Sequence, residues 1–367
     1  MKLFIVLFAV AAIALALASC DNGDEGPAVE EDTSGSPRSF AMGFSSLPAE
    51  LTEESYADAF KLAADTGEVI LIQRTPPWDD LLSGGISDDD AGATQRELQL
   101  AKQYDLDVFF AIDPIETTER GSELAGVPAD LRGSGFGDSR VREAFLEYAQ
   151  YVALNYQPRY LALGVEVNSY ERQNPDDFAQ FVSLYAEAYG AVKEQSPDTL
   201  VFPSFQLEDM TGRLPAGETQ QSQWHVIDDF EPNMDLLAVS TYPSRVFETP
   251  ADIPSDYYRQ LTAHTDKPVG IAEMGYATEP DTEGDESAGE LRQAAFLDRI
   301  MRDADRLGMS LVVWSVRQDP KYTGDPAVSS LLQHIGLVRT DGSEKAAWSV
   351  WENAAQRPLT ADHAQAP

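Results

Sequence analysis

Two glutamates each follow a run of apolar residues that is typical of a buried strand. Glu166 comes directly after YLALGV (160–165), and Glu273 comes directly after PVGIA (268–272). A charged side chain at such a position must be solvated, paired or functional, because unpaired burial is costly. Paired carboxylates suit glycoside hydrolysis: one protonates the leaving oxygen, and the other, about 5–5.5 Å away, attacks the anomeric carbon.

Acidic residues are so frequent in this chain that two strand-end glutamates prove little by themselves. The sequence has 62 Asp and Glu among 367 residues, so rim ion pairs with Arg74 or Arg317 are a structural alternative. Residues at other strand ends favour the chemical interpretation. Tyr242 follows DLLAVS and Trp314 ends SLVVW, and aromatic faces stack on sugar rings. Arg74, in LIQRTPPW, would keep a neighbouring carboxylate ionised.

The elements that must position these residues are short apolar runs that alternate with amphipathic stretches. Runs of this kind are typical of parallel strands covered on both faces. We expect strands at 40–44, 69–73, 107–112, 160–165, 199–204, 235–240, 268–272 and 310–314. Amphipathic stretches at 51–66, 139–156, 176–195 and 287–308 predict helices.

Eight strands alternating with helices predict a single-domain α/β fold, a (β/α)8 TIM barrel over residues 39–356. A barrel would bring the two glutamates to one rim, because all its strands end on the same face. A doubly wound open sheet is the alternative. No Gly-rich phosphate loop follows the first strand, which weakens a nucleotide-binding version of that sheet.

The N-terminal residues predict export. An apolar run from Leu3 to Ala18 is shorter than the roughly 20 residues that span a bilayer. Leu-Ala-Ser-Cys at 17–20 resembles a bacterial lipoprotein signal, which implies a signal peptide at 1–19, lipidation of Cys20 and a membrane partner. An ordinary signal peptide is the alternative. The acidic, Pro/Gly/Ser-rich segment 20–38 predicts a flexible tether to the cell envelope, periplasmic or at the cell surface, and 357–367 predicts a disordered tail.

Composition excludes several classes of partner. A formal net charge of −36 repels phosphate backbones, so we expect no nucleic-acid binding. The chain has four widely spaced histidines and a single cysteine, so a zinc site lacks its usual ligands. We therefore expect no metal and no cofactor.

The strand-end residues resemble those of the clan A retaining glycoside hydrolases. That resemblance implies that Glu166, after strand four, is the acid/base and that Glu273, after strand seven, is the nucleophile. It also implies that Tyr242 hydrogen-bonds the nucleophile and that Trp314 forms the floor of the sugar site. Within the clan, GVEVN and DLLAVSTYP look most like family 53 endo-β-1,4-galactanases, and AEMGY looks like family 113 β-mannanases.

One residue departs from the clan pattern. The clan has Asn directly before the acid/base, where this chain has Val165. If the strand continued, alternation would place Asn168 on the same face as Glu166, where it could contact the sugar instead. Trp78 and Tyr276 are further candidates for substrate binding, with packing as the alternative for Trp78.

The sequence therefore predicts a retaining glycoside hydrolase that uses two glutamates. Its substrate would be a β-linked neutral polysaccharide or oligosaccharide of galactan or mannan type, as for an arabinogalactan endo-β-1,4-galactanase. The alternatives are a catalytically retired carbohydrate-binding lipoprotein of the cell surface and a structural lipoprotein of the envelope.

Overall fold

The computed structural model describes residues 35–116, 123–213, 219–278, 286–322 and 332–360. The predicted signal peptide, Cys20 and the tether up to residue 34 lie outside these residues, as does the end of the predicted tail from residue 361. Across the described segments, no helix combines the length and the apolar character needed to cross a membrane.

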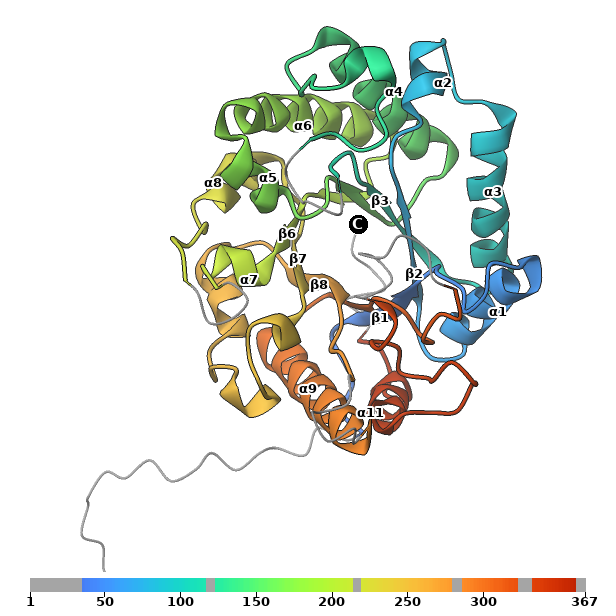
Figure 1. Cartoon of the computed structure of the whole chain (residues 1–367), viewed down its shortest axis with the longest axis vertical. Helices are drawn as coiled ribbons and strands as arrows, with labels where there is room; N and C mark the ends of the chain where they lie inside the picture. Colours follow the sequence, from blue (N-terminus) through green and yellow to red (C-terminus); the bar gives the residue numbers. More distant parts are fainter. Residues whose placement is uncertain (1–34, 117–122, 214–218, 279–285, 323–331, 361–367) are drawn as a thin grey trace, which may run out of the picture. The chain divides into compact units, whose positions relative to one another are not determined.

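Nine parallel strands form one sheet that curves into a barrel with helices outside it (Figure 1). The strands are β1 (Ala41–Ser45), β2 (Val69–Arg74), β3 (Asp107–Ile112), β4 (Tyr160–Leu163), β5 (Leu200–Phe202), β6 (Ser204–Gln206), β7 (Leu237–Thr241), β8 (Val269–Met274) and β9 (Leu311–Trp314). Their order is β5-β4-β3-β2-β1-β9-β8-β7-β6. The TIM-barrel prediction is confirmed, and the open-sheet alternative is wrong.

Strands β5 and β6 are two halves of one barrel strand. Pro203 separates them, and proline has no N–H to donate to a sheet ladder. β5 pairs with β4, whereas β6 pairs with β7, so the two halves of this strand form the two ends of the sheet order. The Ser204 N–H still donates to the Gly164 carbonyl at 3.0 Å. Counted this way, β8 is the seventh barrel strand and β9 the eighth.

The connections between strands are mainly helical. Within the described segments, the helices of four or more residues are α1 (Glu53–Ala64), α2 (Trp78–Leu82), α3 (Asp88–Gln103), α4 (Ser139–Asn155), α5 (Val167–Gln173), α6 (Pro175–Gln195), α7 (Leu207–Met210), α8 (Val226–Phe230), η6 (Tyr258–Ala263), α9 (Glu286–Leu307) and α11 (Ala346–Ala355). Short 3-10 turns η1 (Ala129–Leu131), η3 (Glu231–Asn233), η4 (Pro243–Arg245) and η5 (Pro250–Asp252) lie between them.

Local sequence explains where the long helices begin. Thr52 caps α1 by accepting from the Ser55 N–H at 3.2 Å, and Asp138 caps α4 by accepting from the Arg140 N–H at 2.9 Å. Side-chain oxygens at this position satisfy N–H groups that have no partner inside the helix. Pro175 starts α6, where its fixed φ suits the first helical residue.

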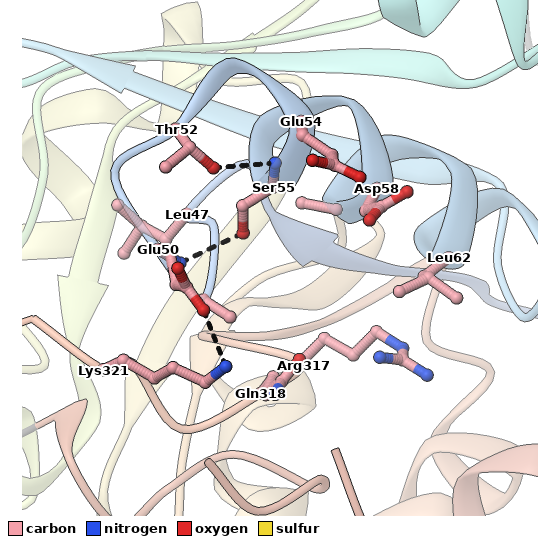
Figure 2. Close-up of a pocket in the computed structure, with 12 residues that line it drawn as sticks. Leu47, Glu50, Thr52, Glu54, Ser55, Asp58, Leu62, Arg317, Gln318 and Lys321 are labelled. Carbon is pink, nitrogen blue, oxygen red and sulfur yellow. Dashed lines mark hydrogen bonds and ion pairs between the residues drawn. The ribbon is translucent and has the colours of Figure 1, made fainter. Parts of the chain in front are cut away.

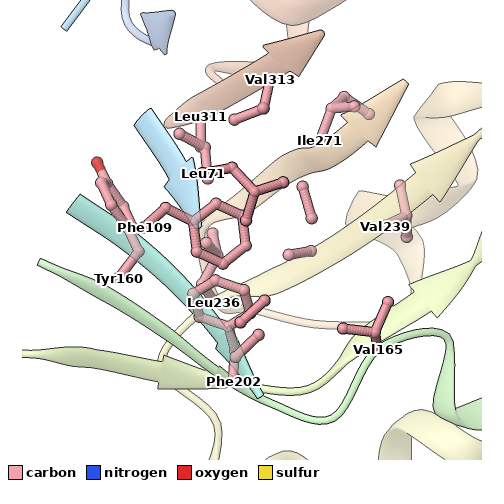
Figure 3. Close-up of a cluster of buried hydrophobic side chains, with 14 of the residues drawn as sticks. Leu71, Phe109, Tyr160, Val165, Phe202, Leu236, Val239, Ile271, Leu311 and Val313 are labelled. Atoms are coloured by element: carbon pink, nitrogen blue, oxygen red, sulfur yellow. The ribbon is translucent and has the colours of Figure 1, made fainter. Parts of the chain in front are cut away.

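Apolar side chains fill the barrel interior, as Figure 3 shows for residues of several strands. Phe109 of β3 packs against Tyr160 of β4 and Phe202 of β5, with ring centroids 6.2 and 5.5 Å apart. Val165 belongs to the same buried cluster and is 5% exposed. The interior is therefore a packed core, and a site must lie on a rim.

The described domain extends beyond the expected bounds of 39 and 356. Arg38 is 2% exposed, donates to the Phe40 carbonyl at 2.6 Å and forms an ion pair with Glu68. Arg357 is 8% exposed and binds Asp305 through two hydrogen bonds of 2.7 and 2.8 Å. Because each arginine is buried with a partner, both belong to the barrel and neither belongs to a flexible tether or tail.

Candidate active site

Glu166 lies just beyond the end of β4 and has an unusual backbone conformation. Its φ of 51° and ψ of 43° lie in the left-handed region, which costs an L-residue about 1–2 kcal/mol. The Glu166 N–H donates to the Ser204 hydroxyl at 3.2 Å, and α5 begins at the next residue. The surrounding fold thus holds the glutamate in a conformation that its own backbone disfavours, as is common at functional sites.

Glu273 lies near the end of β8, and two hydroxyl groups contact its carboxylate. The Tyr242 hydroxyl donates to Oε1, and the Ser315 hydroxyl donates to the same oxygen at 3.0 Å. The two hydroxyl oxygens are themselves 2.7 Å apart. Tyr242 follows β7 and Ser315 follows β9, so neighbours on both sides of β8 fix the orientation of this carboxylate.

Ser240 lies between the two glutamates. Its hydroxyl donates to Oε1 of Glu166, and in the β7–β8 register Ser240 lies opposite Glu273. Paired strands are about 4.8 Å apart. The register shifts between Val239 and Ser240, and this irregularity places Ser240, rather than its neighbour, opposite Glu273. Both carboxylates therefore lie on one rim of the barrel, on either side of β7.

The electrostatics of this rim reflect a concentration of negative charge. Burial raises the pKa of Tyr242 well above its ordinary value, and the charges of Glu273 and Glu166 raise it further. Tyr242 therefore remains a protonated donor at neutral pH. Burial also raises the pKa of Asp209, and the negative charge of Glu166 raises that pKa further. No group of three or more His, Cys, Asp or Glu in the described part of the chain is arranged to hold a metal ion.

Asn168 does not lie on the face of Glu166 as the sequence predicted. The prediction required the strand to continue, but β4 ends at Leu163 and α5 begins at Val167. Asn168 is 0% exposed, accepts from the Gln206 N–H at 2.7 Å and donates to the Gln206 carbonyl at 3.1 Å. It therefore fastens α5 to β6, and no face of its amide is open to a sugar.

Three aromatic residues predicted to contact substrate are buried instead. Trp314 is 0% exposed, and its indole N–H donates to the Ile335 carbonyl at 2.7 Å. Tyr276 is 2% exposed and stacks on Phe296 with ring centroids 5.3 Å apart. Trp78 is 1% exposed, and its indole N–H donates to a backbone carbonyl of the loop after β3. None of the three offers an open ring face. In this structure packing therefore accounts for Trp78, predicted as a sugar platform, for Trp314, predicted as the floor of the sugar site, and for Tyr276, predicted as a subsite residue.

The two arginines proposed as rim partners have other neighbours. Arg74 forms an ion pair with Glu97 of α3, and its guanidinium also donates to the Gln73 carbonyl at 2.8 Å. The Arg317 guanidinium lies over the ring of Trp348, 4.7 Å from its centroid. Among the described residues, neither arginine is therefore placed as the partner of Glu166 or Glu273, and the predicted contact between Arg74 and one of these carboxylates is not seen.

Sequence reasoning missed the serines of this rim. Ser204, Ser240 and Ser315 each donate to, or accept from, one of the two glutamates, and each is at most 2% exposed. Serine is common and carries no spacing signature. The only available signal was that all three occur at or near expected strand ends.

A separate pocket of about 240 Å³ lies between α1 and the segment that follows β9. Figure 2 shows its polar lining, which includes an ion pair of 2.6 Å between Lys321 and Glu50. Arg317 and Gln318 also line it. Neither Glu166 nor Glu273 contributes to this pocket, so it is not the site of the paired carboxylates.

Comparison with known proteins shows a shared fold. No family model matches the sequence, and a search of curated proteins found no match. An exo-β-1,4-mannosidase from Opitutaceae bacterium strain TAV5 aligns with a TM-score of 0.67 and 17% identity over 89% of this chain. This chain covers only 62% of that mannosidase.

Two further solved structures of this fold have glycosidase names. A GH5_18 protein from Streptomyces cattleya, in complex with GlcNAc, aligns with a TM-score of 0.64 and 16% identity, over 88% of this chain and 80% of the other. Xylanase 10B from Thermotoga maritima aligns with a TM-score of 0.60 and 11% identity, over 87% and 95%. The structures most like this chain thus include TIM-barrel glycoside hydrolases, and the low identities establish the fold alone.

Proposed function

We propose that this protein is a retaining glycoside hydrolase in which Glu273 is the nucleophile and Glu166 the acid/base. The observation that carries the proposal is the placement of the two glutamates on one rim of the barrel, on either side of β7. Ser240 donates to Glu166 and lies opposite Glu273 in the sheet. The names of the structural neighbours, which include a mannosidase and a xylanase, support the same reaction class.

The roles follow from how each carboxylate is held. Glu273 accepts from two hydroxyls at one oxygen, Oε1, which orients the carboxylate for attack on an anomeric carbon. Glu166 would give its proton to the leaving oxygen as the bond between Glu273 and the sugar forms. It would then take a proton from the water that releases the sugar, so that the product keeps the configuration of the substrate.

We propose a neutral β-linked glycan of galactan or mannan type as substrate. The formal charge of −36 disfavours a polyanionic glycan, and no cofactor is required for this mechanism. A specific observation favours the alternative of a retired carbohydrate-binding protein: Val165, which stands where the resembled clan has Asn, is buried in the barrel core. Hydrolysis of β-1,4-galactan or β-1,4-mannan by the purified protein separates the two functions.

The experiment compares Glu166→Gln with Glu273→Gln on aryl β-glycosides whose leaving groups differ in acidity. Loss of a general acid costs about 10²–10⁴-fold. We expect Glu166→Gln to lose this factor in kcat/KM on a phenyl glycoside and far less in kcat/KM on a dinitrophenyl glycoside, because that parameter reports bond cleavage and a dinitrophenolate leaves without protonation. Glu273→Gln should be inactive on both. The control is Glu187→Gln, since Glu187 pairs with Arg142 on the outer helices.

Proton NMR of the first product gives the stereochemistry. A β-anomer formed before mutarotation supports the retaining mechanism, whereas an α-anomer would require an inverting one. A wild-type protein that binds the glycans without cleaving any glycoside would instead establish the binding function.

We also propose that the protein is exported and anchored to the cell envelope through a lipid on Cys20, as the residues before it predict. Expression of Cys20→Ser beside the wild type tests this. The wild type should fractionate with membranes and the variant should not, and equal distributions would contradict the anchor.

A further inference from the structure

Glu208 is a buried carboxylic acid that the proposed mechanism does not use. It lies in α7, directly after β6, and is 3% exposed. Burial raises the pKa of its carboxyl group above the ordinary value of 4.5. A buried carboxyl group costs stability unless its oxygens are hydrogen-bonded. The contacts of Glu208 therefore indicate its role.

Four neutral donors reach its two oxygens. Oε1 accepts from the hydroxyls of Thr241 and Tyr257, at 2.7 and 3.2 Å. Oε2 accepts from the backbone N–H of Tyr242 at 3.1 Å and from the amide of Gln206 at 2.5 Å. Two of these donors, Thr241 and Tyr242, are consecutive residues at the end of β7.

These contacts meet β7 where its pairing with β8 is irregular. The register shifts between Val239 and Ser240, so the regular ladder is interrupted before the strand ends at Thr241. The backbone of Tyr242 is then held by Glu208, while its hydroxyl donates to Glu273. Gly275 leaves room for the ring, since a Cβ there would lie 3.0 Å from a ring carbon of Tyr242.

We propose that Glu208 is a positioning residue that holds Tyr242 so that its hydroxyl meets the Glu273 carboxylate. Glu208 acts through Tyr242 and touches neither glutamate of the site in this arrangement of contacts. The inference rests on the proposed function, in which Glu273 is the nucleophile.

The contacts make glutamine a conservative replacement for Glu208. Its carbonyl oxygen can accept from the Tyr242 and Gln206 N–H groups, which only donate. Its NH2 can donate to the hydroxyls of Thr241 and Tyr257, which can also accept. Alanine removes all four contacts, and aspartate keeps the acid on a side chain one methylene shorter.

The experiment measures kcat and KM for Glu208→Gln, Glu208→Ala, Tyr242→Phe and the double variant Glu208→Ala/Tyr242→Phe on one aryl glycoside. We expect Glu208→Gln to stay within about threefold of the wild type, because every contact is kept. Glu208→Ala should lower kcat by no more than Tyr242→Phe does, roughly 40-fold at most, with KM nearly unchanged. The double variant should be no slower than the slower single variant, because both changes remove the same contact to Glu273.

Losses that multiply in the double variant would overturn the proposal, since they would show that Glu208 acts independently of Tyr242. If Glu208→Ala does not fold, Glu208→Asp takes its place in the same cycle. Crystal structures of the wild type and of Glu208→Ala or Glu208→Asp give a readout that needs no activity. A lengthened Tyr242 Oη to Glu273 Oε1 distance supports the positioning role, and an unchanged distance overturns it. An inert wild type would refute the proposed hydrolase while leaving this distance test in force.

Discussion

Replacing Tyr242 with phenylalanine removes one buried oxygen atom and leaves the ring in place. That oxygen donates to Oε1 of Glu273 and lies 2.7 Å from the Ser315 hydroxyl. Tyr242 is 5% exposed, so water does not readily replace the lost donor. Because its raised pKa keeps Tyr242 protonated, the wild type makes this contact throughout the neutral range.

The size of the effect follows from the contacts that remain. A hydrogen bond to a charged group contributes about 1.5–3 kcal/mol. The Ser315 hydroxyl still reaches the same oxygen at 3.0 Å, so we expect the lower half of that range. About 1.5–2.2 kcal/mol corresponds to a roughly 13- to 40-fold fall in kcat.

The assay is steady-state hydrolysis of an aryl β-glycoside, with circular dichroism and thermal unfolding as checks on folding. The matched control is Tyr185→Phe, which deletes the same atom from a tyrosine that is 1% exposed. The Tyr185 hydroxyl donates to the Asn233 carbonyl at 2.8 Å, away from both glutamates. If Tyr242→Phe loses no more activity than this control, the role of Tyr242 as a hydrogen-bond donor to the nucleophile Glu273 is refuted.

Three further predictions concern stability. Glu166→Gly should be more stable to urea than Glu166→Ala by about 1 kcal/mol, because glycine relieves the left-handed strain that alanine keeps; equal stability would contradict the strain. Trp314→Phe should lose about 2 kcal/mol of stability with KM unchanged, since its indole is buried and bonded to Ile335; a raised KM at unchanged stability would restore the sugar-floor role. Glu208 has a raised pKa, so the folded state binds a proton that the unfolded state releases near pH 4.5, and stability from this group falls as pH rises above that value. The glutamine of Glu208→Gln does not titrate, so the urea midpoint of this variant minus that of the wild type should increase between pH 4.5 and pH 8. A difference that stays constant over this range would contradict the raised pKa.

The barrel could be predicted from the sequence because each parallel strand is a continuous apolar run. The prediction for β3 matched its bounds, and those for β1 and β2 differed by one residue at one or both ends. The fifth strand was expected as one element, and Pro203 divides it. That division depends on backbone hydrogen bonds to two different neighbours, which a pattern of apolar residues does not specify.

Single-residue roles were harder to predict because they depend on where a strand stops. β4 ends before Gly164, whose φ is 140°, so the alternation of side chains between the two faces of a strand does not continue to Asn168. Trp314 ends its strand as expected, but its ring turns into the core beside Phe296. The contribution of Ser240 arises only from its register opposite Glu273, which no local sequence pattern encodes.

The most direct test of the central claim is to trap the proposed glycosyl-enzyme and locate it. The protein is inactivated with a 2-deoxy-2-fluoro-β-glycosyl fluoride, digested, and its peptides are sequenced by mass spectrometry. The proposed mechanism predicts a single fluoroglycosyl group on Glu273, absent from Glu273→Gln. A label on another carboxylate, or hydrolysis that proceeds with Glu273 unlabelled, would contradict it.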